Sequence, residues 1–383
     1  MTPSDNRHLT QTSTRVAFLI TGIGFASLAP LIPGIKARLT LNDSALGLLL
    51  LCVGLGSIVI MPFAGGLAAR FGCRAIVFVS ALAMCASLPL IPVAQDQVTL
   101  AFALALLGAG GGTLDVAMNI QAVVVEKAAE RPMMSGFHGM FSVGGIVGAG
   151  GLTALLSLEL SPFLSQGIIA TTCVMMLVAV TPHLLPRQTN IDAQPKIFAF
   201  PKGKVLLLGM LCFIVFMAEG SVTDWSGVLL SDFRHVDLAY AGLGYVAFAA
   251  MMTLNRLTGD IVVAKLSRKS VMFGGCVFAA IGFTLSATVP IAAVSILGFA
   301  MVGIGLANVV PILFTASGNQ NDMPAGLALS SVTTMGYLGL LVGPPMLGFI
   351  AHQTSLLVSL TTLAALCVCV AICTPIVTKG PEN

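Results

Sequence analysis

Three residues able to bind protons or solutes stand within one glycine-rich stretch of the sequence, from Gly108 to Gly151. They are Asp115, Asn119 and His138. Their neighbours are apolar over bilayer-spanning lengths, and an ionisable group at such a depth is usually functional. Asn119 follows Asp115 by four residues, so both should lie on one helix face, where they could bind hydroxyl groups or hold a proton. His138, as a neutral imidazole, could donate to that carboxylate or relay protons.

A second set of such residues lies about a hundred positions further on. Glu219 falls near the middle of the apolar segment 204–230, where a carboxylate in apolar surroundings suits proton uptake and release. Asp224 and Trp225 follow it, and the indole could stack on a sugar or sit at the membrane interface. Asn308 precedes a proline in segment 291–316 and is a candidate solute ligand. The alternative for each residue is a structural role, as a hydrogen-bond partner, a packing contact or a solvated group.

The elements that carry these residues are long apolar segments. The chain has 383 residues, of which 57% are hydrophobic and 9% charged, whereas soluble domains carry about 25% charged residues. This composition predicts an all-α polytopic membrane protein. A span needs about 20 apolar residues, and by that rule we expect twelve transmembrane helices: 16–36, 44–68, 75–94, 98–122, 133–157, 162–183, 204–230, 239–262, 270–289, 291–316, 324–350 and 354–376.

The sequence argues against several other classes of protein. The net charge of +3 is small and gives no sign of nucleic-acid binding. The 9 cysteines lie in or beside apolar runs without the spacing of a metal site, so we expect neither metal nor cofactor. No GxxxxGK[ST] phosphate loop is present, which excludes a nucleotide-driven pump. No nucleophile arrangement or paired metal motif indicates an enzyme.

Lysines and arginines indicate the orientation of the chain. With the amino terminus inside, all but three of the 18 fall on the cytoplasmic side. The three outer cations are Lys36, Arg38 and Arg234. Because lysine and arginine favour cytoplasmic loops, this bias predicts that both termini are cytoplasmic.

The two halves of the chain repeat at an offset of 195 residues. That offset aligns Gly108 with Gly303 and the loop cation Arg74 with Lys269. Secondary transporters use such parallel repeats, with the solute site at mid-membrane between the halves. We therefore expect three parts: an N-terminal six-helix bundle at 1–183, a polar, proline-bearing cytoplasmic linker at 184–203 and a C-terminal six-helix bundle at 204–383.

The loop after the second expected span contains GGLAARFGCR, from Gly65 to Arg74. It resembles the signature G-x-L-A-D-R-x-G-R-R of the major facilitator superfamily; Ala69 replaces the signature's acid, whereas Arg70 matches it. Together with the twelve spans, the two halves and the central loop, the resemblance implies the major facilitator fold of two pseudo-symmetric six-helix bundles.

In that family the acid of the signature joins a cytoplasmic charge network that holds the outward-facing state closed. The resemblance therefore implies a cytoplasmic gate at Arg70 and Arg74, with Arg256 and Asp260 from the second-half copy NRLTGDIVVAKLSRK. Since the acid is absent here, the full network is in question. The alternative is that these cations only anchor the loops on the cytoplasmic side.

Three further segments resemble the MosC-like subgroup of the superfamily: LDVAMNIQA, SGFHGMFSVGGIVGA and AEGSVTDWSGVLL. The resemblance implies a multi-pass protein of the bacterial inner (plasma) membrane. MosC-like proteins are associated with rhizopine, an inositol-type compound, which points by analogy to sugars or polyols. The motifs of drug/proton antiporters are incomplete, because Ala149 stands where they have a proline and Leu104 where they have an arginine.

We therefore expect a secondary active transporter, not an enzyme, that moves a small polar solute by alternating access as a monomeric, proton-coupled symporter. The predicted proton-coupling residues are Glu219, Asp115 and His138, and the predicted substrate-binding residues are Asn119, Asp224, Trp225 and Asn308. One alternative is a drug or metabolite/proton efflux antiporter. An alternative of another class is a membrane sensor that transports nothing.

Overall fold

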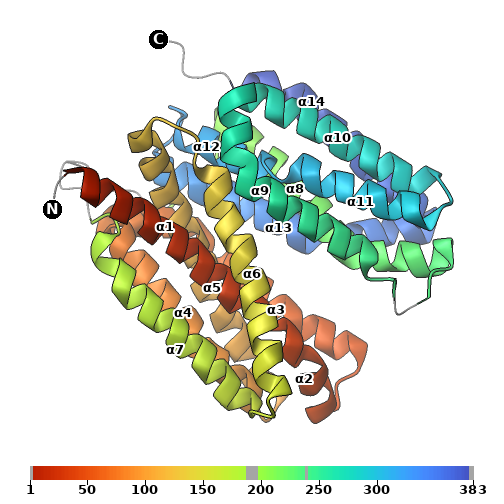
Figure 1. Cartoon of the computed structure of the whole chain (residues 1–383), viewed down its shortest axis with the longest axis horizontal. Helices are drawn as coiled ribbons and strands as arrows, with labels where there is room; N and C mark the ends of the chain where they lie inside the picture. The colour runs from red at the N-terminus through yellow and green to blue at the C-terminus, as the bar shows by residue number, and fades with distance from the viewer. Residues whose placement is uncertain (1–2, 187–196, 238–239, 379–383) are drawn as a thin grey trace. The chain divides into compact units, whose positions relative to one another are not determined.

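The computed structural model describes residues 3–186, 197–237 and 240–378 (Figure 1). These residues form helices and loops, with no strand among them. Within them, 12 helical segments are long and apolar enough to cross a membrane. This finding confirms the prediction of an all-α polytopic membrane protein. The chain divides into two compact units, which are described one at a time.

The first unit comprises residues 1–129, 140–200 and 326–330. Its helices are α1 (Pro3–Ala26), α2 (Ile32–Arg38), α3 (Asp43–Phe71), α4 (Cys73–Val93), α5 (Gln97–Ala129), most of α6 (Met134–Ser157) and α7 (Pro162–Val180). Helix α5 packs against α3, α4 and α1, and α7 packs against α4 and α1. The centre of this unit is therefore α5, which carries Asp115 and Asn119.

The second unit comprises residues 130–139, 201–325 and 331–383, so the first turns of α6 belong to it. Its other helices are α8 (Gly203–Val228), α9 (Leu243–Leu266), α10 (Arg268–Thr288), α11 (Ala292–Leu306), α12 (Val309–Gly318), most of α13 (Ala325–Gln353) and α14 (Leu356–Thr378). Helix α10 packs against α11 and α14, and α9 packs against α11 and α8. The division at a linker 184–203 stays a prediction, and its residues 187–196 lie outside the described residues.

The same close helix packing occurs within each unit, at positions that differ by the predicted offset of 195 residues. A Cβ atom on Gly108 of α5 would meet the carbonyl of Val53 in α3, and one on Gly303 of α11 would meet the carbonyl of Phe248 in α9. Both the glycines and their partners are 195 residues apart. Helix pairs approach this closely only where a side chain is absent. The shared contacts therefore confirm the internal repeat at the level of packing.

Two of the expected spans are broken rather than continuous. The first ends as α1 at Ala26 and resumes at α2, and the tenth is divided into α11 and α12 around Ala307 and Asn308. A break in a helix leaves backbone N–H and C=O groups without their helical partners, and inside a membrane these groups need new ones. At the first break, the buried Gln166 of α7 donates from Nε2 to the carbonyl of Ser27 at 2.9 Å. A buried amide thus closes the break in α1.

Arg38, predicted as an outer-loop cation, closes the end of a helix. Its guanidinium donates to the carbonyl of Pro92 and, at 3.3 Å, to that of Ile91 in the last turn of α4. The last carbonyls of a helix have no partner within it and carry partial negative charge. A guanidinium at this end donates hydrogen bonds to the unpaired carbonyls and compensates their negative charge.

Arg234 does the same in the second unit. Its Nη2 atom donates to the carbonyls of Ser286 at 2.7 Å and Ala287 at 3.1 Å in the last turn of α10. Ser286 and Ala287 lie 195 positions after the two residues that Arg38 contacts, so the cap is duplicated with the helices. Arg234 follows the end of its span, and burial lowers the pKa of its guanidinium.

Candidate functional site

The predicted proton-coupling residue Glu219 forms an ion pair within the second unit. The Nη2 atom of Arg256 in α9 lies 3.3 Å from Oε1 and 3.4 Å from Oε2 of Glu219 in α8. The two side chains are 10% and 15% exposed, respectively. Both residues lie within candidate membrane spans. Opposite charges at such a depth are tolerated when they pair with each other, so each of the two groups compensates the charge of the other.

Arg256 also holds the break in the tenth span. Its Nε atom donates to the carbonyl of Ala307 at 3.2 Å, between α11 and α12. The preceding residue, Asn255, donates from Nδ2 to the carbonyl of Ile304 at 2.6 Å. Two neighbouring side chains of α9 thus bind carbonyls that the break has freed. One guanidinium therefore links the carboxylate of Glu219 to an irregular piece of backbone.

Asn308, a predicted solute ligand, lies in that break and directly precedes α12. It is 3% exposed, and its Oδ1 atom has no hydrogen-bond partner among the described residues. A Cβ atom on Gly259 of α9 would meet this Oδ1 and would lie 2.6 Å from the Cβ of Ser135 in α6. The absent side chain at Gly259 therefore leaves space for the amide oxygen of Asn308, which packs there without a hydrogen-bond partner.

The start of α6 packs on α9 in this unit through Asp260. The backbone N–H of Gly136 donates to Oδ2 of Asp260 at 3.0 Å, and the amino-terminal end of a helix favours a carboxylate. His138, two residues on, makes a 3.0 Å hydrogen bond from Nδ1 to the carbonyl of Met134. Since a carbonyl accepts, Nδ1 carries the proton, and a neutral ring then presents Nε2 as an acceptor.

Asp115 and Asn119 share one face of α5 in the first unit, as their spacing predicts. The Nδ2 atom of Asn119 lies 2.9 Å from the carbonyl oxygen and 3.3 Å from Oδ1 of Asp115. Asn119 is fully buried, and its Oδ1 has no partner among the described residues. The pair therefore offers one carboxylate and one unused amide oxygen.

The two remaining candidates in α8 differ in exposure. Asp224 is exposed, whereas Trp225 is half-buried. The indole lies against Gly348 of α13, where an added Cβ would be 2.9 Å from a ring carbon. Its Nε1–H has no acceptor among the described residues. Trp225 therefore presents an unused donor, as the two asparagines present unused acceptors.

Arg70 and Arg74, expected in a loop, lie instead in the last turn of α3 and the first turn of α4, and they have different contacts. Arg74 donates from Nε and Nη2 to the carbonyl of Leu184, at 3.0 and 2.8 Å, and from Nη2 to that of Pro182 at 2.7 Å. Arg70 lies over the ring of Phe71, 5.3 Å from its centroid. Arg74 thus binds the chain that follows α7, a role that the motif did not suggest. Their part in a gate stays a prediction.

Sequence reasoning did not predict which side chains bind the backbone carbonyls at helix ends and breaks. Asn255, Gln166, Arg38 and Arg234 all bind backbone carbonyls. A polar side chain inside an apolar span is the signal that could have found the two amides. Among the described residues, no group of three or more histidine, cysteine, aspartate or glutamate side chains could hold a metal ion.

The family model for the Major Facilitator Superfamily matches residues 16–320 of the chain. The chain belongs to this superfamily. Its relatives include an uncharacterized MFS-type transporter of Yersinia pestis, 49% identical over 96% of both chains. The membrane protein MosC of Rhizobium meliloti is 31% identical over 95% of this chain and 89% of MosC. Among solved structures, the fucose:proton symporter FucP of E. coli has a TM-score of 0.80, with 14% identity over 96% of this chain and 98% of that one.

These findings settle the class of protein. The chain is a multi-pass membrane transporter with the major facilitator fold, and the resemblance of its sequence to the superfamily and to MosC is confirmed. Of the predicted site residues, the described contacts join Glu219 with Arg256 and Asp115 with Asn119.

Proposed function

We propose that this transporter moves a small polar solute, a sugar or polyol, together with protons across the bacterial inner membrane. In this proposal it works as a monomer with both termini in the cytoplasm. The observation that carries the proposal is the ion pair of Glu219 and Arg256 inside two membrane spans. A buried carboxylate that a proton can neutralise is the group that a proton-coupled transporter requires.

The coupling follows from the double role of Arg256. While Glu219 is ionised, the pair is neutral, and the guanidinium also binds the Ala307 carbonyl at the break. Protonation of Glu219 would remove a charged partner from a largely buried cation, which is unfavourable. Movement of Arg256 would relieve this and would release the backbone between α11 and α12. A proton on Glu219 thereby changes the region next to Asn308.

The choice of a polar solute rests on unused hydrogen-bonding atoms. In the second unit, Asn308 buries an oxygen and Trp225 a nitrogen without a partner among the described residues. An unsatisfied buried polar group costs about 1–3 kcal/mol, and a solute with several hydroxyl groups would supply the missing donors and acceptors. An indole also suits the apolar face of a sugar ring. FucP, similar in fold, is a fucose:proton symporter.

Transport by the purified protein in proteoliposomes tests this function. The vesicles are loaded at pH 7.5, diluted to an outside pH of about 6 and supplied with labelled fucose, xylose or myo-inositol in turn. We expect one of them to accumulate above its outside concentration, and a protonophore to abolish the accumulation. Export of lipophilic cations driven by the same gradient, with no sugar or polyol carried, would contradict the proposal and favour an efflux antiporter.

A further inference from the structure

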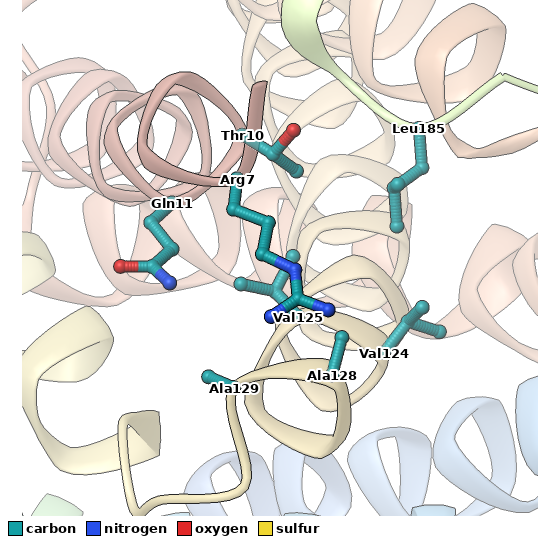
Figure 2. Close-up of a pocket in the computed structure, with 8 residues that line it drawn as sticks. All are labelled: Arg7, Thr10, Gln11, Val124, Val125, Ala128, Ala129 and Leu185. Atoms are coloured by element: carbon teal, nitrogen blue, oxygen red, sulfur yellow. The ribbon is translucent and has the colours of Figure 1, made fainter. Parts of the chain in front are cut away.

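A pocket of about 270 Å³ lies in the first unit between α1, the last turns of α5 and the segment after α7. Figure 2 shows Arg7 extending from α1 toward Val125 and Ala128 of α5, with Leu185 entering from another side. Apart from Arg7 and two polar residues of α1, the lining side chains are aliphatic. The pocket thus combines one guanidinium with an apolar wall.

A network of hydrogen bonds fixes the walls of this pocket. The buried Gln121 of α5 donates from Nε2 to Oγ1 of Thr14 in α1 at 2.9 Å, and its Oε1 accepts from the backbone N–H of Leu185 at 3.1 Å. The backbone N–H of Arg74 donates to the carbonyl of Leu185 at 3.0 Å. One buried amide therefore ties together α1, α5 and the segment after α7. Because Leu185 is held at both its N–H and its carbonyl, the pocket is built into the unit.

Arg7 is the charged side chain among those that line the pocket, and it is exposed. Among the described residues, no carboxylate pairs with the guanidinium of Arg7. A guanidinium presents donors in a planar fork that matches phosphate and carboxylate groups. The aliphatic side chains beside it favour hydrocarbon over a second polar group. The ligand that fits both is an amphiphilic anion, whereas a neutral sugar would leave the cation unmatched.

The position of the pocket along α5 agrees with such a ligand. This helix has 33 residues, about 50 Å at 1.5 Å per residue, and the hydrocarbon core of a bilayer is about 30 Å thick. Val125 and Ala128 lie in its last two turns. The pocket therefore lies near one end of a helix that outreaches the hydrocarbon, at the level of lipid headgroups.

We propose that this pocket binds an amphiphilic anion, with Arg7 on its phosphate or carboxylate and the α5 wall on its adjoining hydrocarbon. The anion comes either from an acidic phospholipid of the surrounding leaflet or from a soluble short-chain amphiphile. This site is separate from the proposed proton and solute groups, so it stands whether or not the transport proposal holds.

Binding to the full-length protein in detergent distinguishes the two sources. The thermal unfolding midpoint is measured against dioleoylphosphatidylglycerol, against dioleoylphosphatidylcholine with the same acyl chains, and against octyl phosphate. We expect a saturable rise with at least one of the two anions and none with phosphatidylcholine. Arg7→Gln should weaken this binding about tenfold, since a hydrogen bond to a charged group is lost. Ala128→Phe should also weaken it, by filling the apolar wall.

Lys127→Gln is the matched control, because Lys127 is an exposed cation beside Ala128 that does not line the pocket. It should bind like the wild type. Response to phosphatidylglycerol alone assigns the site to lipid, and response to octyl phosphate alone assigns it to a soluble amphiphile. The proposal is wrong if neither anion binds, or if Lys127→Gln weakens binding as much as Arg7→Gln does.

Discussion

Arg256 of α9 holds Glu219 of α8 by an ion pair of 3.3 Å, and the same guanidinium binds the carbonyl of Ala307 where the tenth span is broken. One side chain therefore connects a carboxylate to an irregular stretch of backbone inside a membrane. In a superfamily of transporters, this is an arrangement through which the charge of one residue can affect a helix break. The predictions below follow from it and from the packing around it.

Removal of one partner of the pair should destabilise the protein more than removal of both. Arg256→Gln leaves the Glu219 carboxylate uncompensated in the span, and we expect it to lower the free energy of unfolding by about 3 kcal/mol. In Arg256→Gln with Glu219→Gln, much of this loss should be recovered. Unfolding of Arg256→Gln, Glu219→Gln and the double variant in mixed micelles gives the coupling energy, and strictly additive losses would show that the pair contributes nothing.

Two asparagines at the broken span should behave differently. Asn308 has an unused Oδ1, so Asn308→Ala should raise the KM for solute about tenfold with little change in thermal stability. Asn255 binds the Ile304 carbonyl, so Asn255→Ala should lower stability by about 1–2 kcal/mol. Stability and transport kinetics measured on both variants test this. The same loss of stability in both, with unchanged KM, would mean that Asn308 is only structural.

Neighbouring glycines of α6 should differ in their tolerance of a methyl group. A Cβ on Gly148 would meet the backbone of Ile23 in α1, whereas one on Gly150 would meet nothing within 4 Å. Gly148→Ala should therefore destabilise the protein by about 1–3 kcal/mol, and Gly150→Ala should be neutral or stabilising. Thermal unfolding midpoints compare the two directly. Equal effects would contradict the close packing of α1 on α6.

The duplicated arginine caps should contribute similarly to stability. Arg38→Gln and Arg234→Gln each remove a cation from the last carbonyls of a helix, α4 and α10 respectively. We expect each to lower the free energy of unfolding by about 1–2 kcal/mol. Lys36→Gln, two residues before Arg38 in α2, controls for the loss of outer charge. A loss of stability as large in Lys36→Gln would assign the effect to net charge instead of capping.

The class and the number of spans could be predicted from the sequence because membrane solubility depends on apolar length and charge placement. The repeat could be found because closely packed helices require glycine at fixed positions, as Gly108 and Gly303 show against Val53 and Phe248. Local spacing was also sufficient for Asp115 and Asn119, which are four residues apart on one helix.

The partner of Arg256 could not be predicted in this way. Glu219 is 37 residues away on another helix. The hydrophobic pattern of two apolar helices does not indicate which of their faces meet. The motif indicated a cytoplasmic gate role for Arg256, which stays a prediction. Arg256 lies ten residues before the end of α9, about 15 Å along the helix. The contact of Asn255 and the break at Ala307 could not be predicted for a similar reason. Only the packing of the helices shows which backbone carbonyls a side chain reaches.

Solute accumulation by Glu219→Gln under a proton gradient tests the central proposal most directly. Once a transported solute is known, its accumulation is measured in proteoliposomes with and without an inward proton gradient. Exchange of labelled for unlabelled solute at equal concentrations is measured beside it, and Glu159→Gln in the exposed loop before α7 is the control. We expect Glu219→Gln to exchange solute and to lose gradient-driven accumulation, whereas Glu159→Gln keeps both. Accumulation by Glu219→Gln with wild-type pH dependence would contradict the coupling role of the Glu219–Arg256 pair.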